Sequence, residues 1–341
     1  MAAERSDNIE RDLKDFREKY DQVKSEIAKV VVGQNEVVDN TLIALFSGGH
    51  CLLEGVPGLG KTLLVRTLAS VLDLEYSRIQ FTPDLMPADI IGTRIVLESE
   101  GGGRSFEFQR GPIFGQIILA DEVNRATPKT QSALLEAMQE KTVTSGRDHF
   151  ILEKPFLVMA TQNPLEMDGT YPLPEAQLDR FIFKVQVRFP TREELGEVLG
   201  RTTDVYDVAP EQVLDGPQIV RYQELLREIA VAPHVRDYAI RLVLGTHPED
   251  PTATSKVRQF VRYGSSPRGA QALMLGAKIR AALDSRYNVS FQDIRDTALP
   301  ALRHRVMLNF EAEAEGQDAD AIVEEVLDQI PEVVADTPMA S

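Results

Sequence analysis

Cysteine and histidine are scarce in this chain of 341 residues, and basic residues are fewer than acidic ones. Its single cysteine, Cys51, excludes an intramolecular disulfide and fits a reducing compartment, so we expect a cytoplasmic protein. The five histidines are scattered without the short spacings of zinc ligands, which argues against a protein zinc site. Acidic residues outnumber basic ones by 53 to 37, a net charge of −16, and such a surface repels phosphate backbones. Nucleic acid is therefore disfavoured as a partner.

Long hydrophobic stretches are missing as well. No apolar run approaches the roughly 20 residues of a membrane span, and the charged N-terminus lacks the character of a signal peptide. With 43% hydrophobic and 26% charged residues, the composition is typical of a soluble protein with room for two domains. We therefore expect no membrane span.

The most informative stretch is a glycine-rich loop between the apolar run at 51–53 and a helix-like stretch from Thr62 to Leu72. Its residues 55–62 read GVPGLGKT and satisfy the phosphate-loop spacing G-x-x-x-x-G-K-[ST]. Glycines let successive N–H groups point at phosphate oxygens, and the following helix adds its positive dipole end. The predicted nucleotide-binding residues are Gly55, Val56, Pro57, Gly58, Leu59, Gly60, Lys61, Thr62 and Leu63.

Two side chains of this loop carry the expected chemistry. Lys61 would neutralise the β- and γ-phosphates of ATP, and the Thr62 hydroxyl would ligate Mg²⁺. The alternative is a glycine-rich turn that only connects a strand to a helix.

A second element is an apolar run, residues 117–120, that ends in two acids. This pattern is typical of a buried parallel strand whose carboxyl end delivers carboxylates to a ligand crevice. Asp121 would complete the Mg²⁺ site, and Glu122 would be the general base that activates water. Such runs also arise by chance, but this one follows the glycine-rich loop by about 60 residues.

Asn163 follows the predicted strand 156–161 and has two interpretations. Its amide either holds the attacking water or the γ-phosphate, or the residue only makes a turn before Pro164.

Two arginines near predicted element boundaries are open in the same way. Arg180, just before the predicted strand 181–189, is either a solvated charge or an arginine finger aimed at the γ-phosphate of a neighbouring subunit. Arg268 lies in the first turn of a predicted helix, where a cation opposes the helix dipole. It therefore either points into solvent or meets an anion such as phosphate.

The N-terminal 29 residues predict an amphipathic helix, because apolar side chains recur every three or four positions. We expect this helix to pack on a partner or on the main body. Just downstream, Val32 and Gln34 either line an adenine pocket or belong to the core. The apolar stripe consists of Ile9, Leu13, Phe16, Tyr20, Val23 and Ile27.

The remaining patterns divide the chain at Pro190, where Thr191 and Glu194 form a capping box that opens a helix. Before this point we expect strands alternating with helices, interrupted by two β-hairpins around residues 94–109 and 142–152. After it the chain is almost wholly helical. The predicted helices there span about 192–201, 217–230, 233–245, 267–284, 291–299 and 318–330.

Together these motifs resemble the AAA+ ATPases: the glycine-rich loop as Walker A, Asp121 and Glu122 as Walker B, Asn163 as sensor 1, Arg180 as arginine finger and Arg268 as sensor 2. The closer resemblance is to the MoxR family, which is also similar to the magnesium chelatase ATPase subunit. It runs from about Val30 to the end of the chain. The matching stretches are 48–50 (GGH), 53–58 (LEGVPG), 80–84 (QFTPD), 121–125 (DEVNR), 160–164 (ATQNP), 171–181 (YPLPEAQLDRF), 264–269 (GSSPRG) and 309–316 (NFEAEAEG).

The resemblance implies an α/β fold: a three-layer AAA+ core with a five-stranded parallel sheet over residues 30–190, and a C-terminal helical lid over 191–341. The hairpins would be the helix-2 insert and the presensor-1 hairpin. ATP and Mg²⁺ would be the cofactors. The family forms homo-oligomeric, typically hexameric rings that act on client proteins with a von Willebrand factor A domain partner, in a chaperone-like way.

The resemblance leaves two roles open. Arg268 would serve either its own nucleotide or that of a neighbour, and Arg125 would face the next subunit.

Two other functions share part of this sequence evidence. A small-molecule phosphate-loop kinase would need a closing lid, and no Asp-Glu base with a sensor asparagine. A nucleic-acid-acting AAA+ motor would use its hairpins on a duplex. Lys141 and Arg147 are the basic residues of the second hairpin, which is little against a net charge of −16.

Overall fold

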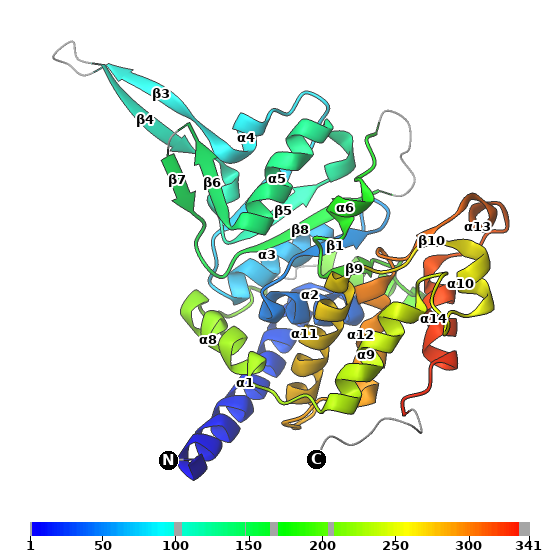
Figure 1. The fold of residues 1–341 in the computed structure, drawn as a ribbon. Coiled ribbons are helices and arrows are strands. Elements are labelled where there is room, and N and C mark those ends of the chain that lie inside the picture. Colours follow the sequence, from blue (N-terminus) through cyan, green and yellow to red (C-terminus); the bar gives the residue numbers. More distant parts are fainter. Residues whose placement is uncertain (1, 99–103, 147, 164–169, 204–207, 334–341) are drawn as a thin grey trace.

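The computed structural model describes residues 2–98, 104–146, 148–163, 170–203 and 208–333. Arg147 was predicted to lie in the second hairpin, and Pro164 to follow a turn. Both residues lie outside these ranges. A parallel sheet covered by helices forms one part of the molecule, and a group of helices lies against it (Figure 1).

The five-stranded parallel sheet is the centre of the first part, as predicted. Its central strands read as continuous apolar runs because helices cover both faces. The parallel register brings the carboxyl ends of β1, β5 and β8 to one edge. In spatial order the strands are β2 (Tyr76–Gln80), β5 (Ile117–Asp121), β8 (Leu157–Gln162), β1 (Cys51–Glu54) and β9 (Phe183–Gln186).

Alternate residues of the strands pack into two separate cores, which makes three layers. On one face, Ile117 and Leu119 pack with α1 (Ala2–Val30), α2 (Asn35–Ser47) and α3 (Lys61–Val71). On the other face, Ile118 and Ala120 pack with α4 (Pro87–Ile91) and α5 (Pro128–Glu140). This alternation follows from the two-residue period of a strand.

Helix α1 packs on the main body, which decides between the two expectations for it. Its apolar stripe from Leu13 to Ile27 is buried. The Phe16 ring lies edge-on to Phe46 of α2, with centroids 5.0 Å apart, and 5.3 Å from Tyr222 of α8 (Gly216–Arg227). Aromatic contacts of this kind add to the free energy gained by burial.

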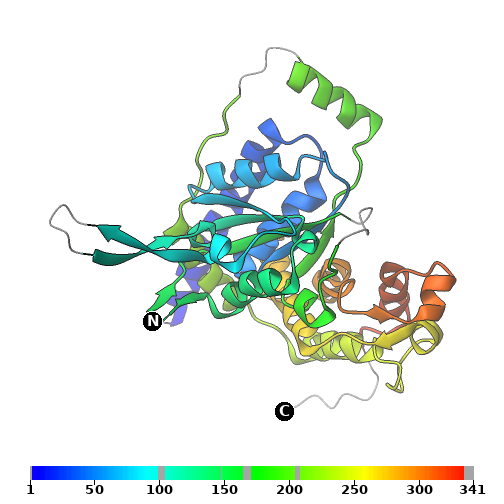
Figure 2. The ribbon, with the colours of Figure 1, turned by 90° about the horizontal axis from the view of Figure 1, so that it is seen from above.

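Both predicted hairpins are present. They are β3 (Gly92–Glu98) with β4 (Arg104–Arg110), and β6 (Thr142–Ser145) with β7 (Asp148–Ile151). The first projects beyond the body of the molecule (Figure 2). The two hairpins touch through stacked rings of Phe108 and Phe150, 4.4 Å apart, and an ion pair between Arg94 and Asp148.

The chain after residue 190 is mainly helical, and its first helix opens with the predicted capping box, since the Thr191 N–H donates to Glu194 Oε2 at 2.8 Å. Within the described ranges, no helix is long and apolar enough to cross a bilayer. Helix α7 has no buried side chain among its twelve described residues and lies at the margin of the molecule (Figure 2). Besides α8, the helices are α7 (Arg192–Thr203), α9 (Pro233–Gly245), α10 (Ser255–Phe260), α11 (Pro267–Leu283), α12 (Phe291–Leu302), α13 (Phe310–Ala314) and α14 (Ala319–Gln329).

The sequence predictions were wrong in two places. Strand β9 spans Phe183–Gln186 instead of 181–189, because its partner β1 spans only Cys51–Glu54. The Glu54 carbonyl accepts the last bond, from Val187 N–H. The helical region also contains a short antiparallel pair, β10 (Val261–Tyr263) with β11 (Met307–Leu308). Short elements that the sequence analysis did not predict elsewhere are α4, α6 (Glu175–Leu178) and the 3₁₀ turns η1 (Pro112–Phe114) and η2 (Val123–Arg125).

The aromatic contacts of α1 predict that Phe16→Ala lowers the free energy of unfolding by about 3 to 5 kcal/mol, the cost of emptying a buried aromatic site. Urea unfolding would measure this. The control is Phe310→Ala, because Phe310 is 83% exposed, and its effect should stay within about 0.5 kcal/mol. Equal effects of the two substitutions would contradict the packing of α1 on the main body.

Candidate nucleotide-binding site

The glycine-rich loop connects β1 to α3, which is the predicted strand, loop and helix context. Gly58 and Gly60 have φ angles of +83° and +76°, a backbone region that L side chains rarely adopt. Gly60 is the N-cap of α3, so the loop leads directly into the positive end of the helix dipole. This backbone suits an anion at the loop.

Lys61 lies across the loop. Its ammonium donates to the carbonyl oxygens of Gly55 at 2.5 Å and Val56 at 3.4 Å. Burial lowers the pKa of Lys61, while the nearby carboxylates of Asp121 and Glu122 oppose that shift. The lysine is therefore held by neutral carbonyls, within the field of the two acids.

Asp121 and Glu122 follow one another at the carboxyl end of β5, and the hydroxyl of Thr161 contacts both. This hydroxyl donates to Asp121 Oδ1 at 2.7 Å and accepts from the Glu122 N–H at 2.8 Å. Glu122 has a left-handed backbone with φ 55°, which for a residue other than glycine costs on the order of 1 to 3 kcal/mol. The Thr161 contact compensates part of this cost. Thr161 was not predicted as a site residue, although a polar residue at the end of an apolar strand can indicate one.

Both acids also have cationic or amide partners. Arg78 of β2 donates to Asp121 Oδ2 at 2.7 Å, and Gln80 donates to Glu122 Oε2 at 3.0 Å. Arg125 donates to the same oxygen of Glu122 at 3.0 Å. The family resemblance implied that this arginine faces the next subunit. The sequence analysis missed Arg78 and Gln80 because only the pairing of β2 with β5 brings them next to the acids.

A cavity of about 300 Å³ brings most of the predicted site together. The buried side chain of Asn163 faces it from the end of β8, together with Lys61, Thr62 and both acids. Placement in this cavity fits the first interpretation of Asn163, a contact with water or phosphate. The lining residues are Pro57, Gly58, Gly60, Lys61, Thr62, Arg78, Gln80, Asp121, Glu122, Thr161 and Asn163.

The oxygen donors at this cavity suit Mg²⁺. Thr62 offers a hydroxyl and Asp121 a carboxylate, the hard ligands that this ion prefers together with phosphate oxygens. Within the described part of the chain, no three His, Cys, Asp or Glu side chains cluster as ligands for a metal. The residues present therefore fit a metal that is held largely by nucleotide.

Val32 and Gln34 do not line this cavity. Gln34 is the N-cap of α2, and its amide donates to the Arg188 carbonyl at 3.1 Å. Gln34 thus lies near the end of β9, and contact of Val32 or Gln34 with adenine stays a prediction.

Arg180 and Arg268 line a different cavity, of about 200 Å³, together with Lys141 and His50. Among the described residues that line it, none belongs to the glycine-rich loop. Arg180 donates to the Leu135 carbonyl at 2.7 Å, and its Nε is buried without a hydrogen-bond partner in the described structure. The fold therefore brings the two arginines together with a lysine, and away from the loop of their own chain.

His50 lines this second cavity, and its ring bonds to backbone groups. Its ring contacts the Met138 carbonyl at 3.1 Å and accepts from the Val158 N–H at 3.0 Å. Burial lowers the pKa of His50 to about 4, so the ring is neutral at physiological pH. The positive charge of the cavity comes from Lys141, Arg180 and Arg268.

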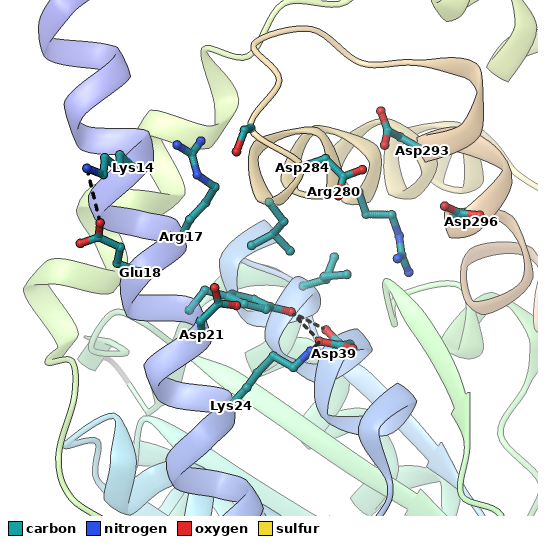
Figure 3. A pocket seen from close by; sticks show the side chains of 14 residues that line it. Lys14, Arg17, Glu18, Asp21, Lys24, Asp39, Arg280, Asp284, Asp293 and Asp296 are labelled. Carbon is teal, nitrogen blue, oxygen red and sulfur yellow. Dashed lines mark hydrogen bonds and ion pairs between the residues drawn. The ribbon is translucent and has the colours of Figure 1, made fainter.

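A larger cavity of about 570 Å³ lies between α1, α2, α11 and α12 (Figure 3). Two of its lysines are paired within the chain: Lys24 contacts Asp39 at 2.7 Å, and Lys14 lies 3.8 Å from Glu18. The Tyr20 hydroxyl donates to Asp39 at 3.2 Å. None of the residues that line it belongs to the predicted site.

Two family models match the chain. Residues 50–183 match the ATPase family associated with various cellular activities (AAA), and residues 253–326 match the AAA lid domain. These two ranges contain the glycine-rich loop, both acids, Asn163 and the two arginines.

Individual proteins are similar over most of the chain. Chaperone MoxR1 of Mycobacterium tuberculosis is 42% identical, over 89% of this chain and 80% of its own. Protein MoxR of Paracoccus denitrificans is 29% identical, over 88% of this chain and 92% of its own. A crystal structure from Cytophaga hutchinsonii, described as that of a candidate ATPase, superposes with a TM-score of 0.89 at 41% identity and covers 96% of this chain and 98% of its own. The chain therefore belongs to the MoxR family of AAA+ ATPases.

Proposed function

We propose that this protein hydrolyses ATP with Mg²⁺ at sites shared between neighbouring subunits of a homo-oligomeric ring. The observation that carries the proposal is the separation of the predicted site into two cavities. A guanidinium stabilises a transferring phosphoryl group only when it lies beside that group. Since Arg180 and Arg268 line a cavity without the loop, they fit the nucleotide of a neighbouring subunit better than their own.

In the first cavity, each residue would have a distinct task. Thr62 and Asp121 would hold Mg²⁺, which neutralises charge on the β- and γ-phosphates when bound. Lys61 would exchange the carbonyls of Gly55 and Val56 for phosphate oxygens, and Arg78 would release Asp121. The first exchange replaces bonds to neutral carbonyls by stronger bonds to charged phosphate oxygens, and the second frees the Asp121 carboxylate for the metal.

Proton transfer would fall to Glu122. A carboxylate takes the proton of the attacking water, and the Asn163 amide orients that water from the neighbouring strand. Thr161 fixes the backbone of Glu122, while Gln80 and Arg125 hold its Oε2. The base is thus oriented before the nucleotide binds.

The process that ATP hydrolysis drives is proposed from the similarity to known relatives. One relative is named Chaperone MoxR1, and on that similarity we infer that hydrolysis drives the remodelling or maturation of client proteins. The projecting hairpin β3–β4 offers exposed apolar side chains, with Phe106 73% exposed, for contact with another protein. Six subunits, a von Willebrand factor A domain partner, kinship with the magnesium chelatase subunit and a cytoplasmic location stay predictions.

The two alternative functions gain no support from the described residues. Lys141, on which a duplex-binding hairpin would rely, lines the cavity with Arg180, and Asp148 of the same hairpin pairs with Arg94. A kinase would transfer phosphate to a substrate hydroxyl, and the described residues that line the cavity with Glu122 and Asn163 offer no feature that favours a second substrate over water.

Lys61→Ala should weaken ATP binding by at least about 100-fold, because charge-assisted bonds to two phosphates are lost. Isothermal titration calorimetry would measure the affinity. Lys129→Ala is the control, since Lys129 is an exposed lysine of α5, and it should bind ATP as the wild type does. An unchanged affinity of Lys61→Ala would refute the phosphate-loop assignment.

Glu122→Gln should still bind ATP but hydrolyse it more than about tenfold more slowly, because the amide keeps the shape and cannot take a proton. Phosphate release under saturating ATP would report the rate. Glu140→Gln, an exposed substitution on α5, should leave the rate unchanged. Turnover of Glu122→Gln near the wild-type rate would show that another group is the base.

Mixtures of two inactive variants test the shared site. Lys61→Ala subunits still offer Arg180 to a neighbour, and Arg180→Ala subunits keep an intact loop. In a ring of head-to-tail interfaces, equal mixing joins an intact loop to an intact arginine at about one interface in four. We expect the mixture to regain ATPase activity that neither variant has alone. Mixed rings that form, by native mass spectrometry, and stay inactive would refute the shared site.

A further inference from the structure

An ion pair between a buried arginine and a largely buried aspartate lies next to the arginine cavity and has no part in the mechanism above. Asp179, the residue before Arg180, accepts from Arg305 Nε at 2.9 Å. Arg305 follows α12 in the helical unit and is only 3% exposed. The pair therefore joins the helical unit to the segment that carries the proposed arginine finger.

Arg305 also binds the backbone on both sides of Arg180. Its Nη2 donates to the carbonyls of Asp179 at 3.0 Å and Phe181 at 2.7 Å, and its Nη1 donates to the Ile182 carbonyl at 3.1 Å. The planar guanidinium presents five N–H donors in a fixed fork and can reach acceptors spread over several residues, whereas an ammonium offers three donors on one compact group. One side chain of the helical unit thus fixes the path of residues 179–182.

Asp179 links the same segment to Arg268. Its Oδ1 accepts from the Ser266 hydroxyl at 2.7 Å, and Ser266 caps α11 by accepting from the Arg268 N–H at 3.1 Å. The Arg268 guanidinium itself lies 3.6 Å from Asp179 Oδ2. The Asp179 carboxylate therefore contacts the start of α11, which carries Arg268, and Asp179 directly precedes Arg180 in the chain.

The Arg305 guanidinium remains charged at neutral pH. Burial lowers the pKa of Arg305 to about 10, and the Asp179 carboxylate opposes that shift. A buried ion pair often adds little net stability, and in some proteins its role is instead to specify how its surroundings are arranged. Here the surroundings are the two arginines of the cavity.

We propose that Asp179 and Arg305 are positioning residues that hold Arg180 and Arg268 in one fixed arrangement towards the nucleotide of the neighbouring subunit. The orientation of the helical unit then sets the orientation of Arg180. This inference rests on the shared site proposed above. Neither residue touches the nucleotide, so both act through the arginines.

The test uses Asp179→Asn, which keeps the shape, and Arg305→Lys, which keeps the charge but cannot reach all the carbonyls. Each variant has an intact loop, so calorimetry should give an unchanged ATP affinity. A misplacement of the order of 1 Å can cost about 100-fold in rate, so we expect kcat to fall at least about tenfold with little change in KM. Arg303→Lys is the matched control, because Arg303 is buried nearby and pairs with Asp320 at 3.0 Å.

Mixing separates positioning from a general loss of structure. Lys61→Ala subunits supply well-placed arginines, so they should restore activity to Asp179→Asn subunits. Arg180→Ala subunits lack the proposed finger and should give no increase over the activity of Asp179→Asn alone. A protein that had lost its own nucleotide site would not respond to either partner in this way. Arg303→Lys should be active without any mixing.

Hydrogen exchange without nucleotide gives an independent readout. In Asp179→Asn, amides of residues 180–183 and 266–269 should exchange faster together, while those of α3 stay as in the wild type. Unchanged exchange in both segments would overturn the inference. So would failure of Lys61→Ala to restore Asp179→Asn when it does restore Arg180→Ala. If it restores neither, the shared site is wrong, and this inference falls with it.

Discussion

Parallel pairing of β1, β5 and β8 is the constraint on which the nucleotide site depends. The register sets Leu53 beside Thr161, and Ala120 beside Ala160, so the three strands end together. The glycine-rich loop, the two acids and Asn163 leave those strands at one edge, where their side chains reach a common cavity. Because Thr161 contacts both Asp121 and Glu122, a shift of β8 by one residue would remove a bond from each acid and leave Glu122 in a strained backbone.

Charge is distributed differently in the two cavities. In the first, Asp121 and Glu122 each contact a cation of the same chain, Arg78 or Arg125. In the second, Lys141, Arg180 and Arg268 face one small space, and Asp179 is the carboxylate that contacts Arg268. In the proposed shared site, a bound triphosphate would meet the cation-rich cavity across an interface, and electrostatic complementarity of this kind favours a defined orientation of subunits. Local clusters of basic residues of this kind are compatible with an acidic protein overall.

Local signals were enough to predict the individual buried strands, both hairpins, the glycine-rich loop and the helix that Thr191 caps, because each depends on residues close in sequence. The five-stranded parallel sheet that these strands form was expected from the family resemblance. The contacts of Arg78 and Gln80 depend on the pairing of β2 with β5, which the chain does not specify locally. Whether Arg268 reaches its own loop depends on how α11 lies against the sheet. The end of β9 depends on where its partner β1 stops. The two-residue strand β11 is too short for a period to be visible.

The central claim is that each ATP lies between the loop of one subunit and the arginines of the next. A cryo-electron microscopy structure of Glu122→Gln rings with ATP tests it most directly, since that variant should retain the nucleotide. The account predicts that Arg180 of one subunit lies about 3 Å from a γ-phosphate oxygen held by Lys61 of its neighbour, within hydrogen-bond distance. An Arg180 that contacts the ATP of its own chain, or that faces solvent in a closed ring, would contradict it.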